Sequence, residues 1–290
     1  MSSTFPLSNL TNEHGKHLVD EESGQEVFHA TTPHSLIQGA GYLKHTRAKR
    51  HRKGVFFRGQ TKLHPTLQPS LLRGVKDGPA NVARRKLLDH FLDDIGAQKK
   101  ALRAVDADCR EALLQHYGIR TTWIDVVDNI WVALWFSCHE ALVAGKVKEY
   151  LHFEKRIQIE PTSKYAYILL LESAYFDPVS GRPGHYRDEK TETIDLRISA
   201  PSHFVRPHAQ HGILVRKLSK TGLPVSDCST MHVGTIRVNL LAAMDWLGTA
   251  STLTTHSLFP PAFYDYGYRE LVDHIHPRDR LLGAIHRVQA

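Results

Sequence analysis

The chain has 290 residues, of which 41% are hydrophobic and 23% are charged, as is usual for a globular protein. No stretch approaches the roughly 20 consecutive apolar residues that a membrane span needs, so we expect no membrane-embedded segment. The first residues do not combine a basic start with an apolar core, and we therefore expect a cytoplasmic protein rather than a secreted one. A formal net charge of +7 favours an anionic partner such as a nucleic acid or an acidic protein.

Cysteine spacing and short motifs narrow the chemistry further. Cys109, Cys138 and Cys228 are far apart and form no CxxC pair, a pattern that is typical neither of a disulfide framework nor of a cysteine-rich zinc site. The sequence also lacks the GxGxxG, GxxxxGK, GxSxG and HExxH motifs of several large enzyme classes.

A histidine cluster is the one feature that could suggest a metal. His203, His208 and His211 lie close together in a basic segment with Arg206. A phosphate-binding loop explains this cluster as well as a metal site does, and no close histidine triad with a carboxylate accompanies it. We therefore predict no metal site.

Taken in chain order, residues 1–25 are polar and without periodicity, which predicts a flexible segment before a single domain over residues 26–290. Residues 44–53 are strongly basic. This run fits a solvated loop or helix end, or alternatively a phosphate-contacting patch beside a binding cleft.

The first half of the domain is expected to be mainly helical. Apolar residues 55–57 predict a buried strand, and the one-sided apolar pattern after residue 79 predicts a helix. A further helix is expected over about 106–117, followed by an extended connector over 119–127. Residues 129–144 predict the central buried helix, because they are apolar on nearly every side as far as Cys138.

The second half is expected to contain most of the strands. Residues 165–171, 212–217 and 232–238 have the composition of strands, and residues 240–247 and 262–274 predict two last helices. Helices that precede a run of strands with helices are typical of an α+β fold. We therefore expect one domain with a central mixed or antiparallel sheet flanked by helices.

Four sequence blocks resemble a known family. The segment VFFRGQ, followed by LQPSLLRG, resembles the opening of the FRG domain family, which is named for its Phe-Arg-Gly motif. LLQHYGIRTTWIDVVDNIWVALWFSC, FVRPHAQHGILV and SLFPPAFYDYG are similar to later blocks of that family and come in the same order, so that the resemblance spans about residues 54–275. The chain departs from the family at Arg120, at Val126 and Val127, and over residues 262–266. The resemblance implies a part in a toxin or phage-defence system.

Arg58 follows the first apolar strand and precedes Gly59. A guanidinium beside a strand core needs a carboxylate, a phosphate or carbonyl groups as partners, and Gly59 leaves the backbone open to a ligand. An Arg-Gly pair at the end of a first strand also resembles ADP-ribosyltransferase folds of the Arg-Ser-Glu type, in which the arginine helps to hold the phosphates of NAD. A structural salt bridge to Asp125 is the alternative.

His116 and Asp125 are the natural partners of Arg58. His116 is expected in the last turn of a helix, where the helix dipole favours a protonated ring that could hold a phosphate or act as a general acid. Asp125 has apolar neighbours on both sides and is therefore expected to be buried and paired, with a general base as the alternative. Where the transferases carry a glutamate on a late strand, this chain has Gln210; Glu270 is a possible substitute in a predicted helix.

These residues lead to one leading hypothesis and two alternatives. The leading hypothesis is an ADP-ribosyltransferase-like toxin or phage-defence enzyme that uses NAD to modify a nucleic acid or a protein. The alternatives are a non-catalytic module that senses a nucleotide, nucleic acid or phage protein, and a metal-independent nuclease. An antitoxin or another defence protein is the expected partner. The expected catalytic residues are Arg58, His116, Asp125 and Gln210, and the expected NAD-binding residues are Arg58, Gly59, Gln60, Tyr117, Thr121 and Gly212.

Overall fold

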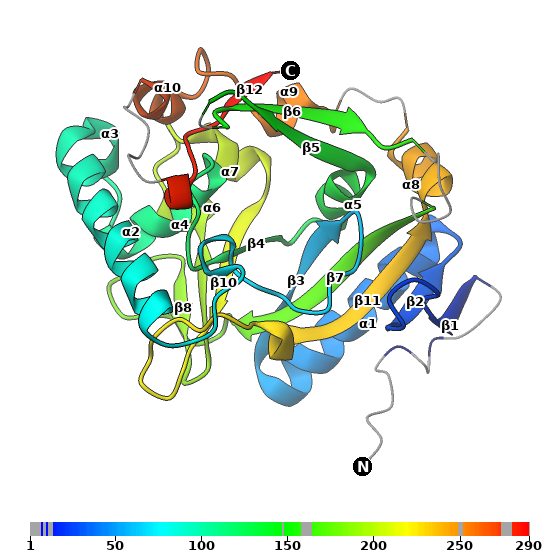
Figure 1. Ribbon diagram of the computed structural model, residues 1–290. Coiled ribbons are helices and arrows are strands. Elements are labelled where there is room, and N and C mark those ends of the chain that lie inside the picture. Colours follow the sequence, from blue (N-terminus) through cyan, green and yellow to red (C-terminus); the bar gives the residue numbers. More distant parts are fainter. Residues whose placement is uncertain are drawn as a thin grey trace.

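A nine-stranded mixed sheet forms the centre of the computed structural model (Figure 1), which describes residues 7, 10, 14–146, 148–157, 164–248, 252–273 and 280–289. Its strands lie in the order β1-β2-β11-β7-β3-β4-β10-β9-β8, and all neighbours are antiparallel except β2 and β11. The strands are β1 (Gly15–Val19), β2 (Glu26–Ala30), β3 (Lys53–Gln60), β4 (Ile124–Val127), β7 (Tyr165–Ala174), β8 (His185–Arg187), β9 (Thr191–Asp195), β10 (Gly212–Lys217) and β11 (His232–Asn239). The α+β prediction with a central mixed sheet is confirmed.

The two faces of this sheet are covered differently. Successive strand residues point to opposite faces, so Val55 and Phe57 join one core while Phe56 joins another. The Phe57 side is covered by α1 (Pro33–His51), α5 (Ile130–Cys138) and α8 (Leu240–Leu247). The Phe56 side packs against loop residues such as Leu67 and Met231. No helix among the described residues is both long and apolar enough to cross a membrane.

A group of helices continues the first layer beyond β10. It has its own core, built on α2 (Pro79–Gln98), α3 (Lys100–Arg103), α4 (Ala107–His116) and α10 (Tyr266–Val272). The short helices α6 (Leu196–Ser199), α7 (Val205–Ala209) and α9 (Thr255–Leu258) connect this group to the sheet. The described residues also form the 3-10 turns η2 (Ser70–Leu72), η4 (Ser229–Met231) and η5 (Arg280–Leu282).

A second sheet of three strands lies near α5, at the top of Figure 1. It consists of β5 (His139–Ala144), β6 (Tyr150–Lys155) and β12 (Arg287–Gln289). The predicted helix over 129–144 is therefore wrong beyond Cys138, because the chain continues from His139 as β5 and pairs with β6 along its whole length. Residues 139–144 leave the apolar core, and a strand partner replaces the backbone hydrogen bonds that a longer helix would have made.

Three other predicted segments can be compared with the helices and strands of the structure. The helix expected over 262–274 begins at Tyr266, where the Asp265 side chain caps it, and residue 274 lies outside the described residues. Within the segment 1–25, which is expected to be flexible, Gly15–Val19 pairs with β2 as the edge strand β1. Residues 44–53 form the end of α1 and the start of β3, and none of them lines the cavity described below.

Candidate functional site

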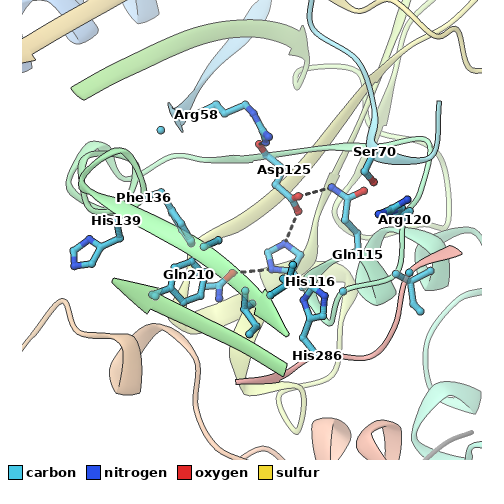
Figure 2. Close-up of a pocket in the computed structure, with 18 of the residues that line it drawn as sticks. Arg58, Ser70, Gln115, His116, Arg120, Asp125, Phe136, His139, Gln210 and His286 are labelled. Carbon is cyan, nitrogen blue, oxygen red and sulfur yellow. Dashed lines mark hydrogen bonds and ion pairs between the residues drawn. The ribbon is translucent and has the colours of Figure 1, made fainter. Parts of the chain in front are cut away.

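A cavity of about 1060 Å³ opens where β3 and β4 face α4, α5 and the three-stranded sheet. Its wall includes residues from widely separated parts of the chain, among them Arg58 on β3, His116 at the end of α4, Asp125 on β4 and Gln210 after α7. Figure 2 shows Asp125 between Arg58 and His116, with Gln210 on the far side of the imidazole ring. The structure therefore brings these four side chains together in one cavity, as the sequence predicts.

The cavity wall is strongly cationic. Its six arginine and lysine residues face only two carboxylate residues, which are Asp125 and Glu140. Such an excess of positive charge in a recess favours an anionic ligand, because the surrounding protein screens the charges less than bulk water does. The six cations are Arg58, Arg73, Arg120, Lys146, Lys148 and Arg280.

Asp125 is the carboxylate at the centre of a polar chain. Its Oδ2 accepts a hydrogen bond from Nε2 of Gln115, whose own Oε1 accepts one from the hydroxyl of Thr121. Its Oδ1 lies 3.6 Å from Nε2 of His116. The side chain is 45% exposed, so the prediction of a buried Asp125 is wrong. Because β4 is followed by α5 and flanked by the cavity, the side chain of Asp125 faces open space, whereas Ile124 and Val126 face the core.

His116 is held from the opposite side by Gln210. Nε2 of Gln210 donates to the carbonyl of Leu258 at 2.8 Å, which leaves its Oε1 as the acceptor toward Nδ1 of His116 at 3.1 Å. Nδ1 must therefore carry a proton, and Nε2 is the nitrogen directed at Asp125. Gln210 fixes the orientation of the imidazole ring with both ends of its amide, so we assign it a positioning role.

Burial lowers the pKa of His116 below its usual range, and the cation of Arg206 lowers it further. The Asp125 carboxylate and the hydrogen bond to Gln210 act in the opposite direction but do not cancel the effect of burial. The neutral ring is thus favoured near neutral pH, with a lone pair on Nε2 that can accept a proton. This differs from the sequence-based expectation of a protonated ring, because the side chain is only 4% exposed and desolvation outweighs the helix dipole.

Arg58 contacts the backbone of Asp125 rather than its carboxylate. Its Nη1 donates to the Asp125 carbonyl oxygen at 2.7 Å, so the salt bridge expected between these two side chains is not the contact they make. Its Nε is buried and has no hydrogen-bond partner in the structure. Burial lowers the pKa of Arg58, and the charge of Arg73 lowers it further, whereas Asp125 raises it. A second cation close to a partly unsatisfied guanidinium is a favourable place for a phosphate group.

Arg206 is a component that sequence reasoning did not select. Its side chain is fully buried, and the guanidinium packs against the stacked rings of Tyr117 and Tyr268, at 4.5 and 4.4 Å from their centroids. Nη1 donates to the backbone carbonyl of His116 at 2.9 Å, so this buried cation fixes the end of α4 that carries the imidazole. The only sequence signal was its place in the basic segment 203–211, where it could not be told from a surface arginine.

Three of the residues expected to bind NAD do not line the cavity. Tyr117 is buried and donates its hydroxyl to Asp265 at 2.9 Å. Thr121 is buried and orients Gln115. Gly212 packs against the His116 ring, where an added Cβ would lie 2.5 Å from Cε1. All three therefore support the site from behind, which corrects the expectation that they contact a ligand.

Gly59 and Gln60 do line the cavity. A Cβ on Gly59 would lie 1.9 Å from the carbonyl oxygen of Ala133, so the glycine is needed for the close approach of α5 to β3 rather than for ligand access. Oε1 of Gln60 is buried without a hydrogen-bond partner and remains available to a donor. Gln60 is thus the better candidate for a ligand contact.

Glu270 and the histidine cluster His203, His208 and His211 do not line the cavity. The carboxylate of Glu270 accepts from the backbone N–H of Ala101 at 2.8 Å and from the Tyr266 hydroxyl, and it does not line the cavity. His211 pairs with Asp128 at 3.0 Å. Among the residues that the structure describes, no group of three or more histidine, cysteine or acidic side chains could hold a metal ion.

Comparison with known proteins identifies one part of the chain. Residues 53–145 match the sequence model of the FRG domain. These residues include β3, α4, β4 and α5, and they carry Arg58, His116 and Asp125. No curated protein and no solved structure matches the chain.

Proposed function

We propose that residues 53–145, which match the FRG domain, contribute the reactive wall of an NAD-binding cavity and that the protein is an ADP-ribosyltransferase. The substrate would be NAD, and the acceptor an anionic macromolecule such as a nucleic acid. The FRG match supports the family, and the geometry of the cavity supports the chemistry. The proposal includes a cytoplasmic role as a toxin or phage-defence enzyme, with an antitoxin or defence protein as partner.

The half-exposed carboxylate of Asp125 carries this proposal. It faces a cationic cavity, Gln115 holds it by a hydrogen bond, and Nε2 of His116 lies 3.6 Å away. A fixed carboxylate in such a place stabilises positive charge that develops on a bound sugar. In ADP-ribosyl transfer, that charge develops on the ribose as its C1′–N bond to nicotinamide breaks and neutral nicotinamide leaves with the bonding electrons. The acceptor then forms the new bond to C1′.

His116 supplies a proton acceptor for this reaction. Its Nε2 lies 3.6 Å from the Asp125 carboxylate that faces the cavity, and the lowered pKa favours the neutral ring near pH 7. The acceptor nucleophile loses a proton as it bonds to C1′, and Nε2 would receive it. Asp125 at 3.6 Å stabilises the imidazolium that results.

The remaining wall suits the rest of a dinucleotide. Arg58 and Arg73 provide neighbouring cations for a pyrophosphate. Nε of Arg58 has no hydrogen-bond partner in the structure and could donate to a phosphate oxygen. Phe136, Phe153 and Phe259 line another part of the cavity and offer apolar faces for the aromatic bases. A cavity of about 1060 Å³ is also large enough for a ligand of this size.

NAD binding and transfer can be measured separately. In a thermal-shift titration, NAD should stabilise the protein, and Arg58→Ala should remove that stabilisation. Incubation with labelled NAD and cell extract should label a macromolecule, and Asp125→Asn should abolish the label while leaving NAD binding in place. Asp177→Asn is the matched control, since Asp177 is an exposed carboxylate outside the cavity. Labelling by Asp125→Asn at the wild-type rate would contradict the proposed role of Asp125.

A non-catalytic nucleotide sensor is the second candidate. The separation of 3.6 Å between Nε2 of His116 and Oδ1 of Asp125 favours it, because this distance exceeds that of a hydrogen bond between catalytic partners. A sensor predicts stabilisation by NAD that is lost in Arg58→Ala, together with no release of nicotinamide and no labelled product.

A further inference from the structure

An exposed group of aromatic side chains lies outside the cavity, on and before α10. Phe263 is 82% exposed and Tyr264 is 65% exposed, and their rings meet edge to face with centroids 5.0 Å apart. Tyr266 is 43% exposed at the start of α10. Isolated exposed aromatic residues need no explanation, but three within four positions of one another form a patch that a folded protein normally covers or uses.

Cationic side chains lie on α10 and on the neighbouring helix α3. The guanidinium of Arg269 lies over the ring of Tyr266 at 4.9 Å from its centroid. Helix α3 packs against α10 and adds Lys100 and Arg103, both exposed. We call Phe263, Tyr264, Tyr266, Lys100, Arg103 and Arg269 the aromatic–cationic face.

The acidic residues of this region weaken the positive charge only in part. The carboxylate of Glu270 is engaged by the hydroxyl of Tyr266 and by the N–H of Ala101 at 2.8 Å. Asp265 is buried and caps α10, and Asp273 lies at the C-terminal end of that helix. Glu270 is thus the acidic side chain next to Tyr266, and its charge is partly compensated by the guanidinium of Arg269 over the same ring.

The loop that carries these rings also leads to the cavity. Phe259 belongs to the cavity wall, and the chain continues from it through two prolines to Phe263. The aromatic–cationic face is thus joined to the cavity wall by a short segment of chain, and a nucleic acid bound to this face would lie near the proposed reaction site. The net charge of +7 favours the same class of partner.

We propose that the aromatic–cationic face binds single-stranded nucleic acid, with bases stacked on Phe263 and Tyr264 and phosphates held by Lys100, Arg103 and Arg269. Stacking on exposed rings needs bases that are free of a duplex, because paired bases present only their edges. A proline-rich or apolar protein partner would not require the surrounding cations. This inference rests on the proposed function in one respect, since it names the acceptor class of the transfer.

Fluorescence anisotropy with labelled oligo(dT) and oligo(U) of about 15 nucleotides, and with a duplex of equal length, tests the face directly. We expect tighter binding of single strands than of the duplex, and a loss of about tenfold or more in the double variant Phe263→Ala, Tyr264→Ala. Phe176 is also an exposed aromatic residue, but it lies on the loop after β7 and outside the aromatic–cationic face. Phe176→Ala should therefore bind as the wild type does. The comparison of the two oligonucleotides shows whether DNA or RNA is preferred.

A second variant tests the charges. Lys100→Gln with Arg103→Gln should lower the slope of log affinity against log salt by about one per phosphate contact that is lost. Wild-type affinity in the Phe263, Tyr264 variant, or equal affinity for single strand and duplex, would overturn the proposal. The NAD-induced thermal shift of the same variants should stay unchanged, so that failure of this face and failure of the proposed NAD chemistry give different results.

Discussion

Gln210 holds His116 by a hydrogen bond of 3.1 Å to Nδ1, while its own amide nitrogen is anchored to the carbonyl of Leu258 at 2.8 Å. Because the two ends of the amide are distinct, this arrangement sets the tautomer of the ring and aims Nε2 at Asp125. The relationship leads to the first prediction.

Replacing Gln210 by glutamate should raise the pKa of His116. A carboxylate at this position would accept from Nδ1–H and stabilise the imidazolium, whereas the amide is neutral. The loss of the donor to Leu258 should also cost about 1–3 kcal/mol of stability. A histidine titration by NMR checks the pKa, and an unchanged or lower pKa would contradict the assigned contact. Gln38→Glu is a control at an exposed position of α1.

The free energy of unfolding should fall as the pH is lowered from about 7 to about 5. Burial lowers the pKa of His116 below 6.5, so the unfolded chain binds a proton in a pH range where the folded chain does not. Stability from this group is therefore present above the unfolded pKa and is lost as the pH falls toward the folded pKa. His29, His139 and His232 have pKa values lowered by burial and act with the same sign.

Urea unfolding at a series of pH values measures this dependence. In His116→Gln the slope of stability against pH over this range should be smaller than in the wild type. His256→Gln should leave the slope unchanged, because His256 is exposed. An identical slope in wild type and His116→Gln would show that His116 is not desolvated in the folded chain.

Gly59→Ala should lower the free energy of unfolding by about 1–3 kcal/mol. The added Cβ would lie 1.9 Å from the carbonyl oxygen of Ala133, so α5 must move away from β3. Gly41→Ala is the matched control, because Gly41 lies in α1 with no atom within 4 Å of an added Cβ. It should be neutral or stabilise the helix by about 0.5–1 kcal/mol. Thermal unfolding of both variants without ligand decides whether Gly59 serves packing.

A buried ion network at β9 predicts a second pH effect. Glu192 is 2% exposed and accepts from His185 Nε2 at 2.6 Å and from Arg216 Nε at 2.7 Å. Despite burial, which raises it, these hydrogen bonds and charges lower the pKa of Glu192 to about 2. Its contribution to stability is therefore present above the unfolded pKa and is lost as the pH falls through about 2.

Glu192→Gln should accordingly cost about 1–3 kcal/mol near neutral pH, because it leaves the partly buried Arg216 without its closest charge partner. The difference from the wild type should shrink as the pH is lowered. Glu154→Gln provides the contrast, since Glu154 is 60% exposed and should change stability little. Equal effects of the two substitutions in denaturant titrations would refute the stabilising role of the network.

Several parts of this protein follow from the sequence alone. Buried strands such as Tyr165–Ala174 and Gly212–Lys217 are runs of neighbouring apolar residues, and the pattern that identifies them is local. The four polar residues of the site stood out because Arg58, His116, Asp125 and Gln210 interrupt or border apolar segments within the FRG blocks. Their convergence followed from the cost of burying such groups without partners.

Only the tertiary structure decided how these groups are used. The end of the helix at Cys138 depends on β6 as a strand partner, and the exposure of Asp125 depends on the cavity beside β4. Gly59, Gly212 and Arg206 owe their roles to Ala133, to the ring of His116 and to two tyrosines, all brought from other parts of the chain. Burial, close packing and desolvation depend on what surrounds a residue in space, and neighbours in the chain do not contain that information.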